Sequence, residues 1–297
     1  MDSISIIIPS YNSSETIPAT LDNIFKLNNV DTVKEVIVVD SSDDKKTKPF
    51  LNNYSNPKVK IITSGVRVMP AIQRNIGARE ASGDILAFID SDAYPDKNWV
   101  AFILETIKEQ TVMGGGSYLL PEFQHDNKVA IAQYYLQFNE FLPAGDIRQK
   151  AFFPSCNIFC KKEFFDEMGG FPEVRASEDT LFCLNAGKKT ELVFNPQAKV
   201  YHIFRTDRKA FLRNQKMLGK FVLVYRKDFY KSFIYKGIMP LLTIPVITLI
   251  KLARLRSRIT QAGKWHRKML RKSLGTFFVG LTYWSFGYVS GIKGVKK

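Results

Sequence analysis

The stretch "DILAFIDSDAYP", residues 84–95, places two carboxylates one residue apart directly behind an apolar run. The run Ile85–Ile89 has the length and composition of a buried strand. Asp90 and Asp92 are separated by one residue, so their like charges repel, and in an extended chain both side chains face the same way. Either the pair lies in water at a strand end, or a positive charge lies between the two carboxylates.

Further apolar runs and helix-period segments alternate around this stretch. The expected strands are Ile4–Pro9, Glu35–Asp40, Val59–Thr63 and Val112–Ser117, and the expected helices are Ser14–Leu27, a short one near Phe50, Pro70–Ala81, Trp99–Gln110 and Val129–Phe141. Such alternation predicts an α/β fold with a largely parallel sheet. Ser13 or Ser14 is expected to cap the first helix, and Pro70 is expected in the opening turn of a later one. A helix is also predicted from Glu178, and a strand ending at His202.

Polar residues follow three of the predicted strands at the point where each strand ends. They are "PSYN" at residues 9–12, "VVDSSD" at residues 38–43 and "DSDAYP" at residues 90–95. In open α/β sheets, ligands bind beyond the carboxyl ends of the strands. The three groups are therefore expected to meet in one crevice.

Charge is distributed very unevenly along the 297 residues. Residues 208–297 hold 21 Lys and Arg against one acid, Asp228, whereas residues 1–207 hold 22 basic and 27 acidic residues, and the whole chain carries +15. The basic residues are interleaved with long uncharged apolar runs, which argues against nucleic acid as the partner. An anionic membrane surface is the partner that this pattern favours.

Cysteine usage and the N-terminus point to a reducing compartment. Cys156, Cys160 and Cys183 form an odd set with no CxxC pair, so neither a disulfide framework nor a zinc knuckle is predicted, and all three are expected to be reduced core thiols. The first apolar run begins close to Met1 and is too short for a signal peptide. The first part of the chain is therefore expected in the cytosol.

Each polar candidate also has an ordinary structural interpretation. Asp90 and Asp92 can be solvated turn residues, and Asp40 a turn former at a strand end. Glu178 and Asp179 can stabilise the start of a helix, where carboxylates are favoured. His202 can be a packed histidine and Arg74 a solvated helix residue.

Five motifs taken together resemble those of the family 2 glycosyltransferases with the GT-A fold. In order they are "SIIIPSYN", "VIVVDSSD", "RNIGAREASGDILAFIDSDAYP", "GGFPEVRASEDTLFCLNAGKK" and "AKVYH", which together lie within residues 3–205. The resemblance implies a Rossmann-like, mostly parallel sheet flanked by helices. It also implies a catalytic domain over residues 1–207, with a nucleotide-binding half at about 1–117 and an acceptor half at about 118–207.

The resemblance implies a role for particular residues of these motifs. Asp179 is implied as the catalytic base, and Asp92, His202 and Asp90 are implied as ligands of a Mn²⁺ or Mg²⁺ ion. The residues implied to bind the nucleotide-sugar are Pro9, Ser10, Tyr11, Asn12, Asp40, Arg74, Asp90, Ser91 and Glu178. The donor is expected to be a UDP-sugar, with a GDP-sugar as the alternative. In "VVDSSD" Ser41 stands where many members of the family have a second acid, so the sequence departs from the family pattern at this position.

The implied reaction is inverting transfer of a sugar from a nucleotide-diphosphate sugar to a hydroxyl acceptor by direct displacement. The metal stabilises the leaving diphosphate as a Lewis acid, and one general base deprotonates the acceptor. A nucleotidyltransferase is an enzymatic alternative, although no Gly-rich phosphate loop with a following Lys is present near the first strand. A basic membrane or nucleic-acid binding protein without catalysis is the other alternative.

The C-terminal part, residues 208–297, is predicted to be a basic helical region that attaches the enzyme to the cytoplasmic face of a membrane. Gly237–Ile250 and Ser273–Ile292 are uncharged, and the nine basic residues of Lys251–Lys272 lie between them. Only Ser273–Ile292, with 20 residues, has the length of a membrane span. Two full spans would put the basic cluster on the wrong side, so an interfacial or re-entrant first segment is expected. Buried helices of a soluble domain are the alternative. A membrane location favours a glycan or lipid-linked acceptor.

Overall fold

The structure is a computed structural model that describes residues 2–293. The chain forms two compact units, Met1–Leu119 with Asp146–His202, and Leu120–Gly145 with Ile203–Lys297. The units interleave along the chain, and the predicted domains, 1–207 and 208–297, stay a prediction. The last four residues of the predicted membrane-associated region lie outside the described residues.

The first unit is built on one sheet with the strand order β3-β2-β1-β4-β8-β6-β9-β5, in which β7 also pairs with β9. The strands are β1 (Ile4–Ser10), β2 (Val33–Asp40), β3 (Val59–Thr63), β4 (Ile85–Phe88), β5 (Ala93–Pro95), β6 (Met113–Leu119), β7 (Arg148–Gln149), β8 (Ile158–Lys161) and β9 (Val193–His202). The first four strands in this order, β3, β2, β1 and β4, pair in parallel, as predicted. Beyond them β8 runs antiparallel between β4 and β6, and β9 is parallel to β6, so the second half of the sheet is mixed.

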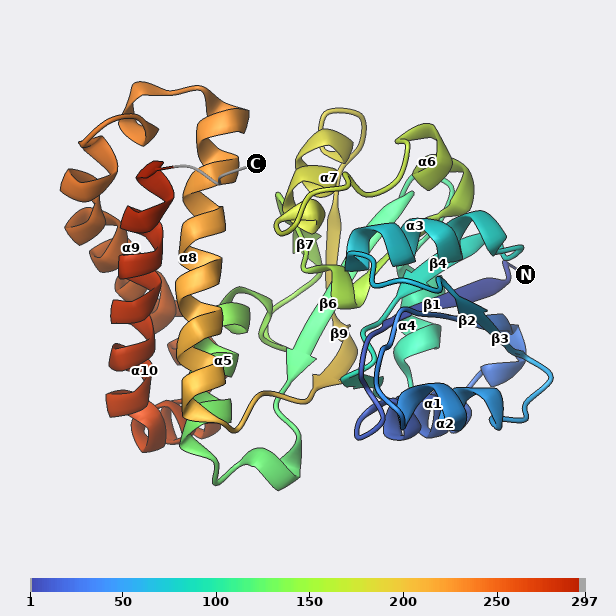
Figure 1. Ribbon diagram of the computed structural model, residues 1–297. Coiled ribbons are helices and arrows are strands. Elements are labelled where there is room, and N and C mark those ends of the chain that lie inside the picture. The colour runs from blue at the N-terminus through green and yellow to red at the C-terminus, as the bar shows by residue number, and fades with distance from the viewer. Residues whose placement is uncertain (1, 294–297) are drawn as a thin grey trace. The chain divides into compact units, whose positions relative to one another are not determined.

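Helices cover both faces of this sheet. They are α1 (Ile17–Ile24), α2 (Thr47–Asn52), α3 (Pro70–Glu80), α4 (Trp99–Thr106), α6 (Lys162–Glu167) and α7 (Glu178–Ala186), with 3-10 turns at Val30–Thr32 and Ser155–Asn157. α3 lies on one face of the sheet, and α1 and α2 lie on the other (Figure 1). Gly77 lets α3 approach β1 closely, because a Cβ at that position would lie 2.5 Å from the Ile7 side chain.

The apolar runs form the buried strands that the sequence predicts. β1 is buried at every position and β4 likewise, which is the pattern of parallel strands covered on both faces. The register pairs Ser10 with Asp40 and Asp40 with Thr63. Ile7 of β1 also pairs with Phe88 of β4. The carboxyl ends of β1, β2 and β4, which carry the three predicted polar groups, are therefore neighbours in the sheet.

The start of α1 differs from the prediction. The N-cap is Thr16, without a side-chain hydrogen bond, rather than Ser13 or Ser14. The Ser13 hydroxyl is instead hydrogen-bonded to the Ser10 hydroxyl, at the end of β1, at 2.8 Å. This hydroxyl therefore does not cap α1. The predicted place of Pro70 in the first turn of α3 is confirmed.

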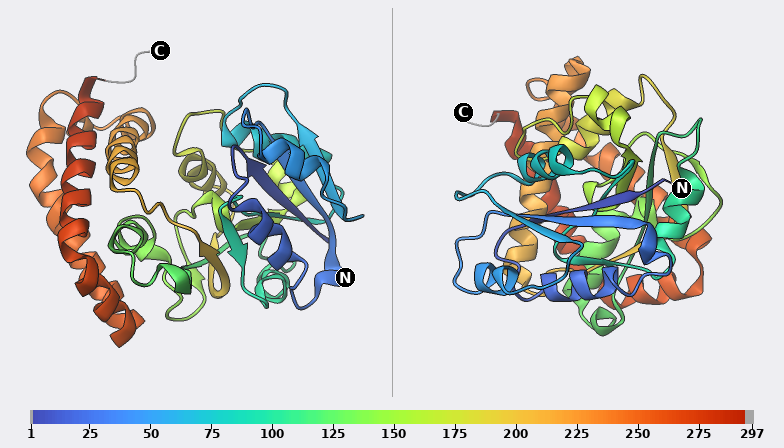
Figure 2. Two further views of the ribbon diagram at one scale, coloured as in Figure 1. Left: turned by 60° about the horizontal axis from the view of Figure 1, so that its bottom comes forward. Right: turned by 90° about the vertical axis from the view of Figure 1, so that its right-hand side faces the viewer.

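The second unit is helical. It contains α5 (Lys128–Phe138), α8 (Arg208–Tyr230), α9 (Met239–Ala262) and α10 (Lys264–Ser290), with 3-10 turns at Glu122–Gln124, Asn139–Phe141, Phe233–Tyr235 and Gly291–Lys293. The helix predicted near Val129–Phe141 is thus confirmed. α10 lies beside both α8 and α9 (Figure 2). Leu223 of α8 packs against Trp284 and Tyr288 of α10.

Two glycines set the distance between α8 and α10. A Cβ at Gly219 would meet the Trp284 carbonyl oxygen at 2.0 Å, and one at Gly287 would meet the Lys216 carbonyl oxygen at the same distance. The two backbones therefore touch where only glycine fits. The uncharged segment Ser273–Ile292 is largely the C-terminal part of α10, and one face of it is buried against α8. Among residues 2–293, no helix combines the length and the apolar character needed to cross a membrane.

Candidate active site

The two carboxylates after β4 lie beside the end of β9. The short strand β5 follows them and pairs antiparallel with β9, with Ala93 opposite His202. This pairing brings the His202 Nε2 atom to 3.6 Å from Asp92 Oδ1. Asp92 is 42% exposed while His202 is largely buried, so the carboxylate faces solvent and the imidazole is fixed behind it.

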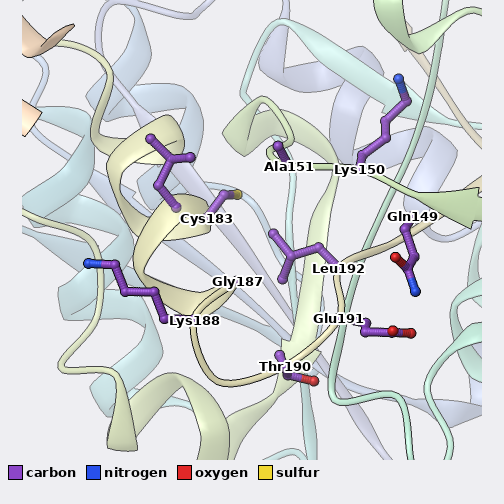
Figure 3. A pocket seen from close by; sticks show the side chains of 10 residues that line it. Gln149, Lys150, Ala151, Cys183, Gly187, Lys188, Thr190, Glu191 and Leu192 are labelled. Carbon is purple, nitrogen blue, oxygen red and sulfur yellow. The ribbon is translucent and has the colours of Figure 1, made fainter. Parts of the chain in front are cut away.

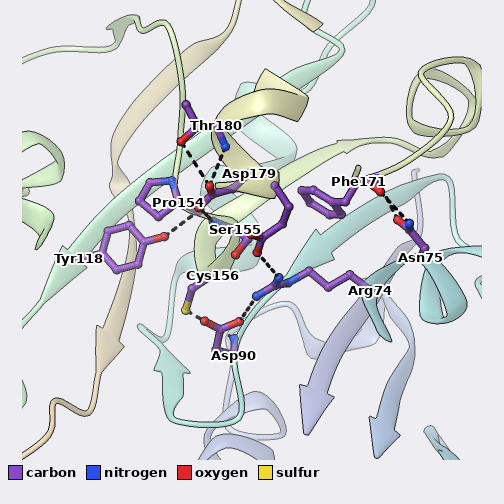
Figure 4. Close-up of polar contacts among 11 residues, drawn as sticks. Arg74, Asn75, Asp90, Tyr118, Pro154, Ser155, Cys156, Phe171, Asp179 and Thr180 are labelled. Carbon is purple, nitrogen blue, oxygen red and sulfur yellow. Dashed lines mark hydrogen bonds and ion pairs between the residues drawn. The ribbon is translucent and has the colours of Figure 1, made fainter. Parts of the chain in front are cut away.

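Arg74 supplies a positive charge beside Asp90. Its guanidinium, on α3, donates to Asp90 Oδ1 at 2.6 Å and to Glu178 Oε1 at 3.1 Å, and the side chain is only 3% exposed (Figure 4). The interpretation of Arg74 as a solvated helix residue is therefore wrong. A buried guanidinium is stable here because two carboxylates neutralise it. Its predicted contact with the nucleotide stays a prediction.

Glu178 and Asp179 begin α7, as predicted, but they do more than complement the helix dipole. The Ser155 backbone N–H donates to Asp179 Oδ2 at 3.2 Å, and the Thr180 N–H donates to Asp179 Oδ1 at 2.6 Å. Burial raises the pKa of Asp179 despite these hydrogen bonds. Burial, with the adjacent Asp179 charge, also raises the pKa of Glu178, and this outweighs the opposing effect of Arg74.

A thiol completes a group of possible metal ligands. One ligand atom each from Asp90, Cys156 and His202 lie within 4.8 Å of one another. The three cysteines are buried and free, as predicted, but Cys156 lies in the site rather than in the core alone. Its position follows from the pairing of β4 with β8, a non-local contact that no local motif reveals.

The ends of β1 and β2 form a second polar group. Ser10 and Ser42 donate to Asp40 Oδ1 at 2.8 and 2.6 Å. Asp40 Oδ2 is buried with no hydrogen-bond partner, which leaves an acceptor for a donor group of a ligand. The Gln73 amide, which the sequence did not single out, donates to the carbonyls of Ser10 and Val39 at 2.7 Å each and holds the two strand ends together.

The residues after β1 are tied to the loop after β2. Asn12 adopts a left-handed conformation with φ 51°. Its side chain donates to Asp43 Oδ1 at 2.7 Å and accepts from the Asp44 N–H at 3.2 Å. Tyr11 donates to Asp43 Oδ2 at 3.0 Å, and the guanidinium of Arg67 lies 4.2 Å from the centre of the Tyr11 ring. Tyr11 thus lies between the Asp43 carboxylate and the Arg67 guanidinium, just beyond the carboxyl end of β1.

The remaining predicted residues lie at the same strand ends. Pro9 is buried in β1 opposite Val39. Ser91, between the two carboxylates, accepts through its carbonyl from Thr20 at 3.1 Å. The structure therefore brings the predicted residues to the carboxyl ends of β1, β2 and β4 and the end of β9, while their roles stay predictions.

A separate pocket of about 460 Å³ lies beside α7 and the start of β9 (Figure 3). It is lined by Gln149, Lys150, Ala151, Cys183, Leu184, Gly187, Lys188, Thr190, Glu191 and Leu192. None of the predicted site residues lines it.

Residues 5–169 match the family described as Glycosyl transferase family 2. Glycosyltransferase AglE of Haloferax volcanii is 28% identical over 172 residues, covering 57% of this chain and 56% of that protein. The UDP-Glc:alpha-D-GlcNAc-diphosphoundecaprenol beta-1,3-glucosyltransferase WfgD of Escherichia coli is 26% identical over 157 residues, covering 53% and 57%. The chain thus spans little more than half the length of these relatives.

Solved structures share the fold at low sequence identity. The mannosyltransferase PcManGT of Pyrobaculum calidifontis, solved with GDP-Man and Mn²⁺, superposes with a TM-score of 0.64 at 16% identity, covering 99% of this chain and 88% of that chain. GalNAc-T7, solved with UDP, GalNAc and Mn²⁺, superposes with a TM-score of 0.58 at 15% identity, covering 81% and 54%. The family match extends over more than half of the sequence and the fold agrees with it, so the chain belongs to glycosyl transferase family 2 and has the GT-A fold.

Proposed function

We propose that the chain is an inverting glycosyltransferase that moves a sugar from a nucleotide-diphosphate sugar to a hydroxyl acceptor. The observation that carries the proposal is the convergence of Asp90, Asp92 and His202 at one end of the sheet, with Arg74 joining Asp90 to Glu178, the neighbour of Asp179. A nucleotide-sugar needs groups for its nucleoside, its diphosphate and its reacting carbon. The chain offers a separate set of side chains for each.

The nucleoside is assigned to the ends of β1 and β2. Asp40 keeps one buried carboxylate oxygen unsatisfied, and this oxygen can accept from an N–H or O–H of a base or ribose. Tyr11 offers an aromatic face beside the base, with Arg67 already stacked on the ring. A UDP-sugar is the favoured donor, and a GDP-sugar is the alternative. The solved relatives with UDP and with GDP-Man are consistent with either.

The diphosphate is assigned to a divalent cation, Mn²⁺ or Mg²⁺, held by Asp92, Asp90 and His202. Asp92 is exposed enough to meet a ligand and lies next to His202, and carboxylate oxygens are ligands that suit Mn²⁺ and Mg²⁺. When bound, the cation neutralises negative charge on the leaving diphosphate. Arg74 keeps Asp90 oriented through their ion pair, so the carboxylate set is fixed before the donor arrives.

Asp179 is assigned as the general base for the acceptor hydroxyl. Two backbone N–H groups fix its orientation, and its raised pKa makes it a stronger base than an exposed aspartate. The proton moves from the acceptor hydroxyl to Asp179 as the acceptor oxygen attacks the face of the anomeric carbon opposite the leaving group. Because the diphosphate leaves in the same single displacement, the configuration at the anomeric carbon is inverted.

The acceptor is assigned to glycans or lipid-linked glycans at the cytoplasmic face of a membrane. The name of the Escherichia coli relative includes a diphosphoundecaprenol acceptor. In this chain the first half of α9 exposes Leu241, Leu242, Val246 and Leu249, and Ile238 just before the helix is exposed too. The basic residues of Lys251–Lys272 follow directly. An apolar face next to a basic cluster fits an anionic membrane surface.

The experiment that tests the proposal is calorimetry of UDP and GDP binding with and without Mn²⁺. We expect one of the two nucleotides to bind the native chain more tightly when Mn²⁺ is present. Asp92→Ala should remove this gain while the protein stays folded, because the carboxylate is exposed. Asp96→Ala, on the loop before α4, is the control and should keep the gain. Equal metal dependence in the native chain and Asp92→Ala would refute the assignment.

A further inference from the structure

We propose that Cys156 is a thiolate ligand of the divalent cation, which gives this centre a preference for thiophilic ions over Mg²⁺. The inference rests on the metal-dependent function proposed above and adds a ligand that the motifs do not contain. The three ligand atoms of Asp90, Cys156 and His202 lie within 4.8 Å of one another. These separations are close to the spacing of side chains that share one ion, and small side-chain rotations bring all three atoms to bonds of about 2.0–2.3 Å.

The thiol is directed toward the carboxylates rather than into an apolar core. Its Sγ atom accepts from the Asp90 backbone N–H at 3.4 Å, and the residue is 2% exposed (Figure 4). The next residue, Asn157, fixes the turn: its side chain accepts from the Trp99 indole at 2.8 Å and donates to the carbonyls of Ser117 and Ala198. The backbone of Cys156 therefore has little freedom to turn the thiol away.

The other two ligands are also held in place. Asp90 is fixed by Arg74 at 2.6 Å. His202 is fixed by the pairing of β9 with β5, in which it lies opposite Ala93. Asp92 lies 3.6 Å from His202 on the solvent side. A cation on these side chains has oxygen, nitrogen and sulfur donors within a preorganised shell.

The donor set determines which ions bind best. Mg²⁺ prefers oxygen ligands in octahedral geometry and dehydrates reluctantly. Thiolate and imidazole favour softer divalent ions such as Co²⁺, Zn²⁺ and Cd²⁺. On binding, the S–H bond of Cys156 is replaced by a sulfur–metal bond and the proton passes to water. A site with this thiol should therefore rank Cd²⁺ and Co²⁺ far above Mg²⁺.

The other two cysteines provide matched controls. Cys160, in β8, and Cys183, in α7, are as buried as Cys156, and neither belongs to the ligand group. Cys183 accepts from the Phe153 N–H at 3.3 Å, a contact like that of Cys156 with Asp90. Serine at each position keeps a hydrogen-bond acceptor and removes the sulfur, so the three variants change the same atom in different surroundings.

The test is the near-ultraviolet absorption of Co²⁺ bound to the full chain in the presence of UDP. A sulfur-to-cobalt charge-transfer band is expected for the native chain, Cys160→Ser and Cys183→Ser, and is expected to be lost in Cys156→Ser. Cobalt that binds the native chain without this band would overturn the role of Cys156 but leave the metal site intact. Failure of the native chain to bind cobalt at all would overturn the metal site and this proposal together.

A second measurement does not depend on the folding of any variant. The ¹¹³Cd NMR signal of Cd²⁺ bound to the native chain should lie downfield, in the range of sites with one sulfur ligand. A signal in the range of oxygen and nitrogen sites would overturn the proposal.

The affinity for Cd²⁺ gives a third measurement. In folded Cys156→Ser, confirmed by circular dichroism, this affinity should fall by on the order of 10-fold or more, since loss of even an outer partner of a metal site costs 10–100-fold. The affinity for Mg²⁺ should change little.

Discussion

Arg74 explains how the fold accommodates two carboxylates one residue apart. It pairs with Asp90 and leaves Asp92, which is 42% exposed, to face solvent and His202. The repulsion within the pair is therefore relieved on one side by a buried guanidinium. The sequence indicated a positive charge or water beside the acids, and the fold places the guanidinium at Asp90 and both solvent and His202 at Asp92.

Replacing Arg74 tests how far the fold depends on this ion pair. In Arg74→Met two partly buried carboxylates, Asp90 and Glu178, lose their partner. Breaking a buried pair from one side costs roughly 3–5 kcal/mol, so the free energy of unfolding measured in urea should fall by about 3 kcal/mol. The control is Lys60→Met, which removes the exposed ion pair with Glu80 and should change stability little. Equal stability of the two variants would contradict the role given to Arg74.

Asp179 carries the pH dependence of the proposed reaction. Its pKa is raised by burial, and a general base acts only when deprotonated. The transfer rate should therefore fall as the pH drops through a pKa above the ordinary value of about 3.9 for aspartate, and should level off above it. The measurement is kcat as a function of pH. An acid limb at the ordinary aspartate value would contradict the assignment.

Removing the base should separate catalysis from binding. Asp179→Asn keeps the size of the side chain and should lower kcat by on the order of 10²–10⁴ while donor binding is retained. Asp166→Asn, on the exposed side of α6, is the control and should transfer at the native rate. If Asp179→Asn also transfers at the native rate, Asp179 is only a helix-start residue.

At the scale of elements, the strands and helices with clear periodicity were predictable. Val59–Thr63 is β3 with the predicted bounds, and α7 begins at Glu178 as expected. Both are set by local sequence, since apolar runs and helix starts need no distant partner. The ends of β1, β2 and β4 therefore carried the predicted site residues to the expected edge.

The features that the sequence did not predict depend on contacts between residues far apart in the chain. β5 has only three residues and ends in Pro95, and it exists because β9 pairs with it. Cys156 enters the site because β8 inserts antiparallel between β4 and β6. Gln73 holds two strand ends together from a helix that shows no sign of this in its own pattern. Local motifs cannot report such contacts.

The helix pair of the second unit gives a prediction of its own. Gly219→Ala puts a Cβ 2.0 Å from the Trp284 carbonyl oxygen, so α8 and α10 must separate, at a cost of about 1–3 kcal/mol in stability. Gly275→Ala is the matched control, since nothing lies within 4 Å of its Cβ, and it should stabilise α10 by about 0.5–1 kcal/mol. Thermal unfolding of both variants checks this. A stabilising Gly219→Ala would contradict the close packing.

At the scale of the whole chain, charge separates the C-terminal part from the rest. Residues 208–297 carry a balance of +20, and α9 exposes a row of apolar side chains. Each basic residue near an anionic surface contributes about 1 kcal/mol, and salt screens only this part. Membrane attachment should therefore weaken at high salt without being lost.

Liposome flotation checks this prediction with a pair of surface variants. The native chain should float with anionic vesicles, and the double variant Leu242→Glu with Leu249→Glu, both on the exposed part of α9, should float much less. Val66→Glu, an equally exposed apolar position in the first unit, is the control and should float like the native chain. A native chain that stays with the soluble fraction would show that these side chains serve another purpose.

The most direct measurement of the central claim is release of nucleoside diphosphate from a panel of UDP-sugars and GDP-sugars with Mn²⁺. The account predicts slow release from at least one nucleotide-sugar by the native chain, with loss of release on chelation of the metal and in Asp92→Ala. Release of pyrophosphate from a nucleoside triphosphate, and none of diphosphate from any sugar donor, would indicate a nucleotidyltransferase. No release from any donor by a folded, nucleotide-binding chain would contradict the claim that it is a glycosyltransferase.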